Sequence, residues 1–346
     1  MTRATTMRFG TFHLIGSPEM APARDRFDET LSHINLADQL GFDMVWVAEH
    51  HFSNYGYSAN PLLLIARAAA TAPRVRFGQA VLVSPFWHPL RLAEDIATTD
   101  LLTGGRLDIG LGRGYQPLEF HGFAIAQDES RSMFAEHFEL MRLAWTQDDF
   151  TFSGQHYHVP TPITVLPRPL QQPHPPIWLA VQSETSLKWA AANGCNVLLT
   201  GGGTEWDVLG RWIDTHRNAA GSQARIGVLR HVLVTEREAD ARAALWQSRW
   251  QRNVATQLRL GKERVRGGRN DLTGYVDETT EEAWWDRVVY GTPERCIAQL
   301  RRQADQGVTD FLAWFDIGGL PAAQVQTSMQ LFAHEVMPAL ATTVAH

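Results

Sequence analysis

The chain is poor in cysteine, with only Cys195 and Cys296 among 346 residues. Two cysteines cannot build a disulfide framework or an all-cysteine zinc site, and they favour a reducing, cytoplasmic location. Long apolar runs are also missing: residues 62–72 form the longest, and Arg67 interrupts it well short of a membrane span. The first nine residues lack the apolar core of a signal peptide. We therefore expect a cytoplasmic protein that makes no membrane contact.

An excess of basic charge is lacking too. The chain has 31 Lys and Arg against 37 Asp and Glu, a formal net charge of −6. A nucleic-acid partner is therefore not expected, because binding phosphates requires clustered positive charge. Hydrophobic residues make up 44% of the chain and charged residues 20%, which excludes a disordered chain. No segment has the composition of a linker, so residues 1–346 are expected to form one domain.

What the sequence does contain is a regular alternation of short apolar runs with stretches of helical period. Eight runs are predicted as strands, each followed by a helical signal: residues 8–14, 44–47, 75–83, 107–111, 177–181, 196–199, 226–234 and 309–314. The first helix is expected to end at Gly41, and the last to begin after Gly319 with Pro321 in its first turn. Eight βα units predict an α/β fold, a (β/α)8 TIM barrel. An open, doubly wound sheet is the alternative.

Two stretches interrupt the alternation and are predicted to be insertions. Residues 148–176 contain a predicted hairpin, residues 150–159, followed by a proline-rich segment. Residues 260–286 are polar and dotted with glycine, and they end after the pair Trp284-Trp285. Long loops of a barrel often cover its active site, so this second stretch is predicted to be a mobile lid, with disorder as the alternative.

In a barrel, catalytic groups gather where the strands end. Glu49, His50 and His51 follow the second predicted strand directly. A histidine there can act as a base or an acid, because unperturbed imidazole titrates at about pH 6.5. A histidine that only caps the next helix is the alternative. No metal site is expected, because adjacent strand residues point in opposite directions and no third ligand has a matching spacing.

Two further groups are candidates for binding an anion. Gly110 to Tyr115 follow the fourth predicted strand, where glycine lets the backbone approach a ligand and Arg113 can hold a phosphate; a tight turn alone is the alternative. Ser183 follows the fifth predicted strand and is a good helix N-cap, and a helix start also attracts anions. Arg131 lies at the start of another predicted helix and adds a positive charge. Considered without the other two groups, it is more typical of a solvated surface residue. Together they would form one phosphate site if barrel closure joins them.

The run Gly-Phe-Asp-Met-Val-Trp-Val-Ala-Glu-His-His-Phe at residues 41–52 resembles the bacterial luciferase-like, flavin-dependent monooxygenase family. The resemblance continues in order over nearly the whole chain, at residues 60–61, 91–95, 103–107, 110–120, 130–131, 176–189, 291–296 and 328–338. It is nearest to the alkanal monooxygenase-like branch. It implies a (β/α)8 barrel that binds reduced FMN at the carboxyl ends of its strands.

The resemblance also implies roles for individual residues. His50 matches the catalytic histidine of the family, and Ala80-Val81 match a non-prolyl cis peptide beneath the flavin ring. The residues implied in cofactor binding are Glu49, Ala80, Val81, Arg113, Tyr115, Arg131, Gln182, Ser183 and Ser186. Residues 260–286 lie where the family has a mobile active-site loop. Gly112 stands where light-emitting members often have a reactive cysteine, so light emission is not expected.

The activity implied by the resemblance is that of an FMN-dependent monooxygenase. Reduced FMN from a separate flavin reductase would react with O2 to a C4a-peroxyflavin, which oxidises a small aldehyde, ketone or aliphatic substrate. Phe86, Trp87 and Tyr115 are expected to line the substrate pocket, and a homodimer is implied. Two alternatives are a hydride-transferring oxidoreductase of the same superfamily that uses the deazaflavin F420, and a non-catalytic partner subunit.

Overall fold

The computed structural model describes residues 7–199, 204–221, 224–262, 264–271 and 279–341. Its strands form a closed parallel barrel of β1 (Arg8–His13), β2 (Met44–Val47), β3 (Arg76–Gln79) continued by β4 (Leu82–Val83), β5 (Leu107–Gly112), β8 (Ile177–Ala180), β9 (Asn196–Leu199), β10 (Ile226–Val234) and β14 (Asp310–Trp314). The sheet closes because β14 pairs with both β10 and β1. The predicted TIM barrel and its eight predicted strands are thereby confirmed, and the open sheet is excluded.

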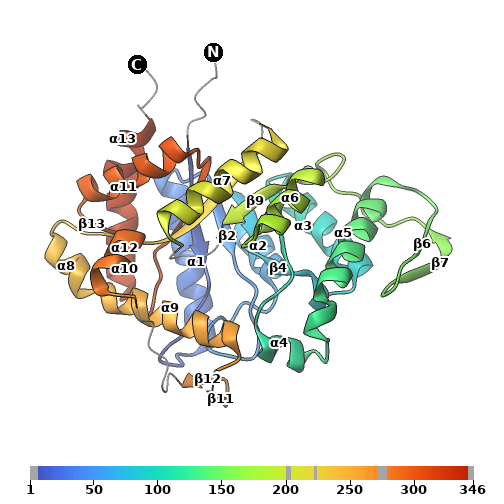
Figure 1. The fold of residues 1–346 in the computed structure, drawn as a ribbon, viewed down its shortest axis with the longest axis horizontal. Helices are drawn as coiled ribbons and strands as arrows, with labels where there is room; N and C mark the ends of the chain where they lie inside the picture. Colours follow the sequence, from blue (N-terminus) through green and yellow to red (C-terminus); the bar gives the residue numbers. More distant parts are fainter. Residues whose placement is uncertain (1–6, 200–203, 222–223, 263, 272–278, 342–346) are drawn as a thin grey trace.

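Helices surround the barrel in the predicted alternation (Figure 1). They are α1 (Ala23–Leu40), α2 (Pro61–Ala69), α3 (Pro89–Leu102), α5 (Ser130–Thr146), α6 (Glu184–Ala192), α7 (Trp206–Ala220), α8 (Glu238–Ala243), α11 (Pro293–Gln306), α12 (Ala322–Leu331) and α13 (Met337–Ala341). As predicted, α1 ends at Gly41, which takes a left-handed conformation with φ 83°. Helix α12 begins at Ala322, so Pro321 is its N-cap and not part of its first turn. Outside the barrel, β13 (Val289–Gly291) adds to the end of β10.

The two ends of the barrel are covered differently. In Figure 1, α13 lies at the top, and α4 (Pro117–Gly122) and α9 (Leu245–Leu260), which follow the carboxyl ends of β5 and β10 in the chain, lie toward the bottom. At the bottom also lies the small hairpin of β11 (Arg264–Arg266) and β12 (Arg269–Asp271). Helices α4 and α9 contact each other. These elements form the walls around the carboxyl ends of the strands.

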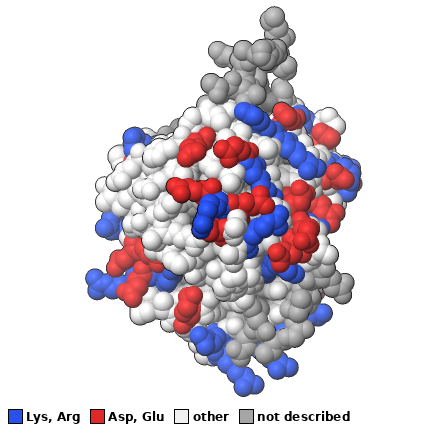
Figure 2. Space-filling model, turned by 90° about the vertical axis from the view of Figure 1, so that its left-hand side faces the viewer, with Lys and Arg blue, Asp and Glu red and all other residues white. Residues whose placement is uncertain are grey.

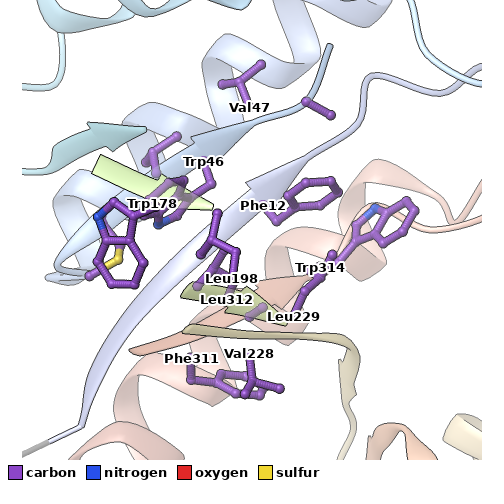
Figure 3. Packing of buried hydrophobic residues seen from close by; sticks show 14 of the residues in the cluster. Phe12, Trp46, Val47, Trp178, Leu198, Val228, Leu229, Phe311, Leu312 and Trp314 are labelled. Carbon is purple, nitrogen blue, oxygen red and sulfur yellow. The ribbon is translucent and has the colours of Figure 1, made fainter. Parts of the chain in front are cut away.

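Aromatic side chains fill the barrel interior (Figure 3). Trp46 and Trp178 are fully buried and meet edge to face, with ring centroids 5.5 Å apart. Phe12 packs edge to face on Trp314 at 5.0 Å, and both also line the cavity described below. Edge-to-face pairs of this kind add to the stabilisation that burial of each ring already provides. The aromatic core of the barrel is therefore also the floor of its cavity.

The first insertion folds as predicted, with β6 (Phe150–Ser153) and β7 (His158–Ile163) forming an antiparallel hairpin. The second, residues 260–286, contains more regular structure than expected among its described residues, and its mobility stays a prediction. Gly267 and Gly268 have φ of 54° and 79° and connect β11 to β12 as a two-residue turn, a geometry that favours glycine at both positions. Thr280 caps a further helix, α10 (Glu281–Arg287), through the Ala283 amide. Residues 263 and 272–278 lie outside the described residues.

The hairpin of β11 and β12 is attached to the loop that follows β2. The backbone N–H of Asn54 donates to the Gly268 carbonyl at 2.7 Å. The backbone N–H of Asn270 donates to Asn54 Oδ1 at 3.0 Å. The Asn54 side chain also donates to the Ser17 carbonyl at 3.0 Å. One asparagine therefore joins the hairpin to the loops after β1 and β2.

Charges of both signs are interleaved on the side of the molecule drawn in Figure 2, which is the left-hand side of Figure 1 where α8 and α11 lie. Surface pairs there include Arg237 with Asp240 and Arg242 with Glu238. On this face the described basic side chains therefore have acidic side chains close to them. Among the described helices, none combines the length and the apolar composition that a membrane crossing needs.

Candidate active site

A cavity of about 590 Å³ opens at the carboxyl ends of the barrel strands. Its volume lies within the range typical of sites for small molecules and cofactors. The structure brings all the sequence-predicted site residues to its wall: Glu49, His50, Ala80, Val81, Arg113, Tyr115, Arg131, Gln182, Ser183 and Ser186. These residues come from loops that follow four different strands and from the start of α5. Closure of the barrel is what joins them.

Glu49 is fully buried at the end of β2, and its carboxylate is saturated with hydrogen bonds. It accepts from the Val83 amide at 2.9 Å, from the Trp87 indole at 3.0 and 3.1 Å, and from His51 Nε2 at 3.0 Å. Burial raises the pKa of Glu49, and these donors act in the opposite direction. Glu49 therefore fixes the loop after β2 against β4.

His50 forms a pair with a carboxylate that the sequence analysis did not identify. Its Nδ1 lies 2.9 Å from Glu119 Oε1, on α4, and 3.0 Å from Gln116 Nε2. The same Glu119 oxygen accepts the His51 amide at 2.9 Å. Glu119 Oε1 only accepts and Gln116 Nε2 only donates, so Nδ1 bonds to Glu119 when it carries a hydrogen and to Gln116 when it does not. In the tautomer that bonds to Glu119, Nε2 has the lone pair. This arrangement orients the imidazole and suits it to move a proton.

The loop between β3 and β4 contains a cis peptide bond at Ala80-Val81, the position that the family resemblance implies. Gly112, at the end of β5, lies directly against it. A Cβ added to Gly112 would come within 2.4 Å of Val81 Cγ2. Glycine is therefore required at position 112 by the contact with Val81 of the chain itself, and close approach of these glycines to a ligand stays a prediction.

Arg113 and Arg131 face the same part of the cavity. Partial burial lowers the pKa of Arg113, and the positive charge of Arg131 lowers it further. Two guanidinium groups that repel each other across a cavity wall favour an anion between them, because it removes the repulsion and accepts their hydrogen bonds. Arg131 is exposed, as the surface-charge interpretation expects, and it also lines the cavity.

The turn at the start of α6 adds hydroxyl groups to the same wall. Ser183 caps the helix as predicted: its hydroxyl accepts the Ser186 amide at 3.3 Å and lies 2.9 Å from the Ser186 hydroxyl. Gln182 precedes this turn, and its side chain is exposed. Hydroxyl and amide donors at a helix start complement the two arginines as an anion site.

Two of the three residues expected to line the substrate pocket pack elsewhere. Phe86 and Trp87 are not among the described residues that line the cavity. The Trp87 indole donates to Glu49 instead, and Phe86 stacks on Phe123 with ring centroids 4.8 Å apart. The expectation failed because both side chains are engaged with other parts of the chain, Trp87 with Glu49 and Phe86 with Phe123. Tyr115 does line the cavity.

The sequence analysis missed a second group of lining residues. They come from β10, β14 and α9 and include Leu229, His231, Gln251, Arg252, Thr256 and Trp314. A signal was present in β10, because Arg230 and His231 are adjacent polar residues in a strand that is buried along its whole length. Polar residues in such a strand need specific partners. The helical insertion of α9 gave no comparable signal.

One acid–histidine group lies elsewhere, at Glu29, His33 and Asp316. Arg26 lies between its carboxylates, 2.6 Å from Glu29 and 2.8 Å from Asp316. The guanidinium therefore supplies the positive charge that a metal ion would bring, and the group is an ion-pair cluster.

The cavity lies at the carboxyl ends of the barrel strands, where enzymes of the (β/α)8 barrel class have their active sites, and the histidine–carboxylate pair and the Ser183 turn both lie there. The family model for luciferase-like monooxygenases matches residues 7–310. The chain therefore belongs to the luciferase-like monooxygenase family, as the motifs implied.

Relatives extend over almost the full chain. The oxygenase component of the flavin-dependent trigonelline monooxygenase of Acinetobacter baylyi is 30% identical over 96% of this chain and 95% of its own. The crystal structure of monooxygenase RslO1 from Streptomyces bottropensis superposes with a TM-score of 0.85 at 29% identity, covering 96% of this chain and 99% of that one.

More distant structures share the fold alone. The oxygenating constituent of 3,6-diketocamphane monooxygenase from Pseudomonas putida, solved with FMN, has a TM-score of 0.80 at 20% identity and covers 96% and 98% of the two chains. An F420-dependent secondary alcohol dehydrogenase has a TM-score of 0.70 at 17% identity, covering 97% and 99%. The fold therefore accommodates both kinds of flavin, and the choice between them depends on the site.

Proposed function

We propose that this chain is the oxygenase component of a two-component monooxygenase. It would bind reduced FMN delivered by a separate flavin reductase and use O2 to oxidise a small organic substrate. The observation that carries the proposal is the presence, in one cavity, of the oriented pair His50–Glu119 and of the anion site formed by Arg113, Arg131 and the Ser183 turn.

The residues of the cavity fit FMN in their chemistry. A phosphate carries two negative charges and several acceptor oxygens, and Arg113, Arg131, Ser183 and Ser186 supply cations and donors at one place. The Ala80-Val81 segment lies in the same wall, where the family resemblance places the flavin ring. Glu49 would support cofactor binding by holding the loop after β2 in place, because its carboxylate oxygens already accept hydrogen bonds from three residues of the chain.

Reduced flavin would supply the electrons that activate O2, and the protein residues would do the remaining work. His50 lines the cavity and can take or return one proton, while Glu119 stabilises the charged imidazole. The aromatic floor of Phe12 and Trp314 keeps bulk water away from the reacting groups. We therefore place the reacting part of the substrate beside His50.

The F420 alternative has one supporting observation: Arg252 and Arg259 also line the cavity and make its mouth more basic. A direct test titrates the protein anaerobically with reduced FMN and, separately, with reduced F420. We expect tighter binding of reduced FMN. Tighter binding of reduced F420 would contradict the proposed function, and absence of binding by either would favour the partner-subunit alternative.

We also propose a homodimer, as the family resemblance implies. Leu63 on α2 and Leu102 on α3 are 69% and 64% exposed, and these two helices lie against each other. Leu63 lies at the start of α2 and Leu102 at the end of α3, so they are two separate exposed apolar positions, and the dimer proposal rests on the family resemblance. Light scattering coupled to gel filtration should give twice the mass of the chain, and Leu63→Glu with Leu102→Glu should give the monomer mass.

A further inference from the structure

The loop that carries His50 closes on itself. The backbone N–H of His50 donates to the Ser58 carbonyl at 3.0 Å, so the loop returns to the point where it begins. Gly56 packs against the base of this loop, because a Cβ added there would come within 2.9 Å of the Leu14 carbonyl oxygen and 3.2 Å of His50 Cβ. Glycine fits this contact, and it brings the preceding residue, Tyr55, beside the imidazole.

Two tyrosine rings contact the His50 ring. The centroids of Tyr55 and His50 are 4.7 Å apart, with the ring planes at 75°. Tyr115, from the loop after β5, meets the same imidazole at 6.0 Å and 78°. Contacts of this edge-to-face kind are attractive, and the nearer one restricts how far the imidazole can tilt. Tyr55 is 7% exposed and lines the cavity, as His50 does. The imidazole, which bonds to Glu119 at Nδ1, is therefore also supported on its ring.

The hydroxyl end of Tyr55 is enclosed by two other elements. It lies close to the Tyr115 hydroxyl and to the side chain of Gln251 on α9, and both neighbours lower its pKa. Burial is the larger effect and raises the pKa of Tyr55 to about 12. The phenol therefore keeps its proton near neutral pH and does not exchange one with His50. What Tyr55 contributes to His50 is contact.

The residue before Tyr55 fixes the same loop from outside. Asn54 bonds to Gly268 and Asn270 of the hairpin of β11 and β12, at 2.7 and 3.0 Å. The backbone N–H of Tyr55 itself donates to Ser53 Oγ at 3.4 Å. Adjacent residues of one loop therefore have different partners, the hairpin for Asn54 and the imidazole for Tyr55.

We propose that Tyr55 is a positioning residue: its ring keeps the His50 imidazole against Glu119 and in the cavity wall. The hydrogen bonds of His50 with Glu119 and Gln116 involve one atom, Nδ1, about which the ring could still tilt. A misplacement of about 1 Å can slow a reaction about a hundredfold, so the ring needs support beyond this atom. The inference rests on the proposed function, because it concerns the residue that would move protons there.

Reoxidation of bound reduced FMN by O2 gives a readout that requires no knowledge of the substrate. Reduced FMN loses two electrons and two protons in this reaction and O2 becomes H2O2, so a proton carrier in the cavity affects its rate. We expect His50→Ala to change the rate constant about tenfold or more. Tyr55→Leu removes the ring and should change the rate constant in the same direction by about threefold or more. Tyr55→Phe keeps the ring and should stay within about twofold of the wild type.

Two comparisons separate positioning from general damage to the fold. Tyr57→Leu changes a tyrosine of the same loop whose hydroxyl donates to Met20 Sδ at 3.8 Å, and it should leave the rate constant within about twofold of the wild type. In a His50→Ala background, Tyr55→Leu should cause no further change, because the contact that it removes no longer has its partner. All these variants should keep the FMN dissociation constant of the wild type.

The outcomes that overturn the inference differ from the one that overturns the proposed function. An effect of Tyr55→Leu that persists in the His50→Ala background would overturn the inference, and so would equal effects of Tyr55→Leu and Tyr55→Phe. A rate constant unchanged in His50→Ala would also overturn it, because His50 would then carry no proton. Failure of the wild type to bind reduced FMN, measured in the same samples, would contradict the proposed function itself.

Discussion

At the scale of single residues, the site depends on a contact between two loops. His50 follows β2, Glu119 lies on α4, and 69 positions separate them in the sequence. The carboxylate both orients the ring through Nδ1 and stabilises its protonated form. His50 would therefore be a poor proton carrier without Glu119.

Glu119→Gln tests this pair. The amide keeps the size and an acceptor oxygen but removes the negative charge. We expect turnover with reduced FMN to fall about tenfold to a hundredfold, in the range of general acid–base effects, while the FMN dissociation constant stays the same. Glu129→Gln, which changes an exposed carboxylate, is the matched control. Unchanged turnover in Glu119→Gln would show that the pair has no catalytic role.

The anion site can be tested with a ligand that lacks the anion. Arg113→Met should weaken FMN binding about tenfold to a hundredfold, because one charge-assisted contact with the phosphate is lost. Riboflavin has the same ring system and no phosphate, so its affinity should change little. Equal weakening of both ligands would mean that Arg113 does not contact the phosphate. Arg249→Met, outside this cavity wall, serves as a control for loss of an arginine.

Much of the site could be predicted from the sequence because it lies directly after strands or at helix starts. Glu49, His50, Arg113 and Ser183 are of this kind, and all reach the cavity wall. Glu119 could not be predicted, because nothing local marks a carboxylate on a surface-like helix as the partner of a distant histidine. The chemical roles of these residues stay predictions until the variants are measured.

At the scale of elements, the hairpin of β11 and β12 is the part that sequence patterns did not predict. Its strands have three residues each and alternate little in polarity, so only the Gly267-Gly268 turn marks it. The eight barrel strands were predictable because they are buried runs of apolar and β-branched residues. For α10 the signal was the cap Thr280 followed by two acidic residues, but the surrounding polar sequence obscured it.

Asn54→Ala tests whether the hairpin is held by the loop after β2. This change removes Asn54 Oδ1, which accepts from the backbone N–H of Asn270, and Asn54 Nδ2, which donates to the Ser17 carbonyl. Amide hydrogen exchange in residues 264–271 should become about fivefold faster or more, as expected for the loss of a hydrogen bond. Asn60→Ala is the control, because Asn60 caps α2 and does not touch the hairpin. Exchange that is equally slow in Asn54→Ala would contradict this account of the hairpin.

At the scale of the whole molecule, buried neutral histidines couple folding to pH. Burial lowers the pKa of His13, His137 and His231 to about 3 each. In the unfolded chain these groups titrate near 6.5, so below that pH the unfolded state binds more protons than the folded state. The free energy of unfolding should therefore fall as the pH falls through 6.5. The raised pKa of Glu49 acts in the opposite direction and only partly offsets three histidines.

Urea unfolding at pH 6.5 and 5.5 measures this effect. We expect a loss of about 1 kcal/mol per histidine over that interval, and about 3 kcal/mol for the three together as an upper value. His137→Leu replaces one titrating ring by an apolar side chain of similar volume. Its unfolding free energy should depend less steeply on pH, by about one proton. The same slope in both proteins would contradict neutral burial of His137.

The central claim is that the cavity binds reduced FMN and shields it from solvent. The most direct measurement mixes anaerobic protein and photoreduced FMN rapidly with oxygenated buffer and follows the visible absorbance of the flavin. We predict reoxidation markedly slower than that of free reduced FMN, which becomes faster when a substrate is present. Reoxidation at the rate of free reduced FMN, with no effect of added protein, would contradict the claim.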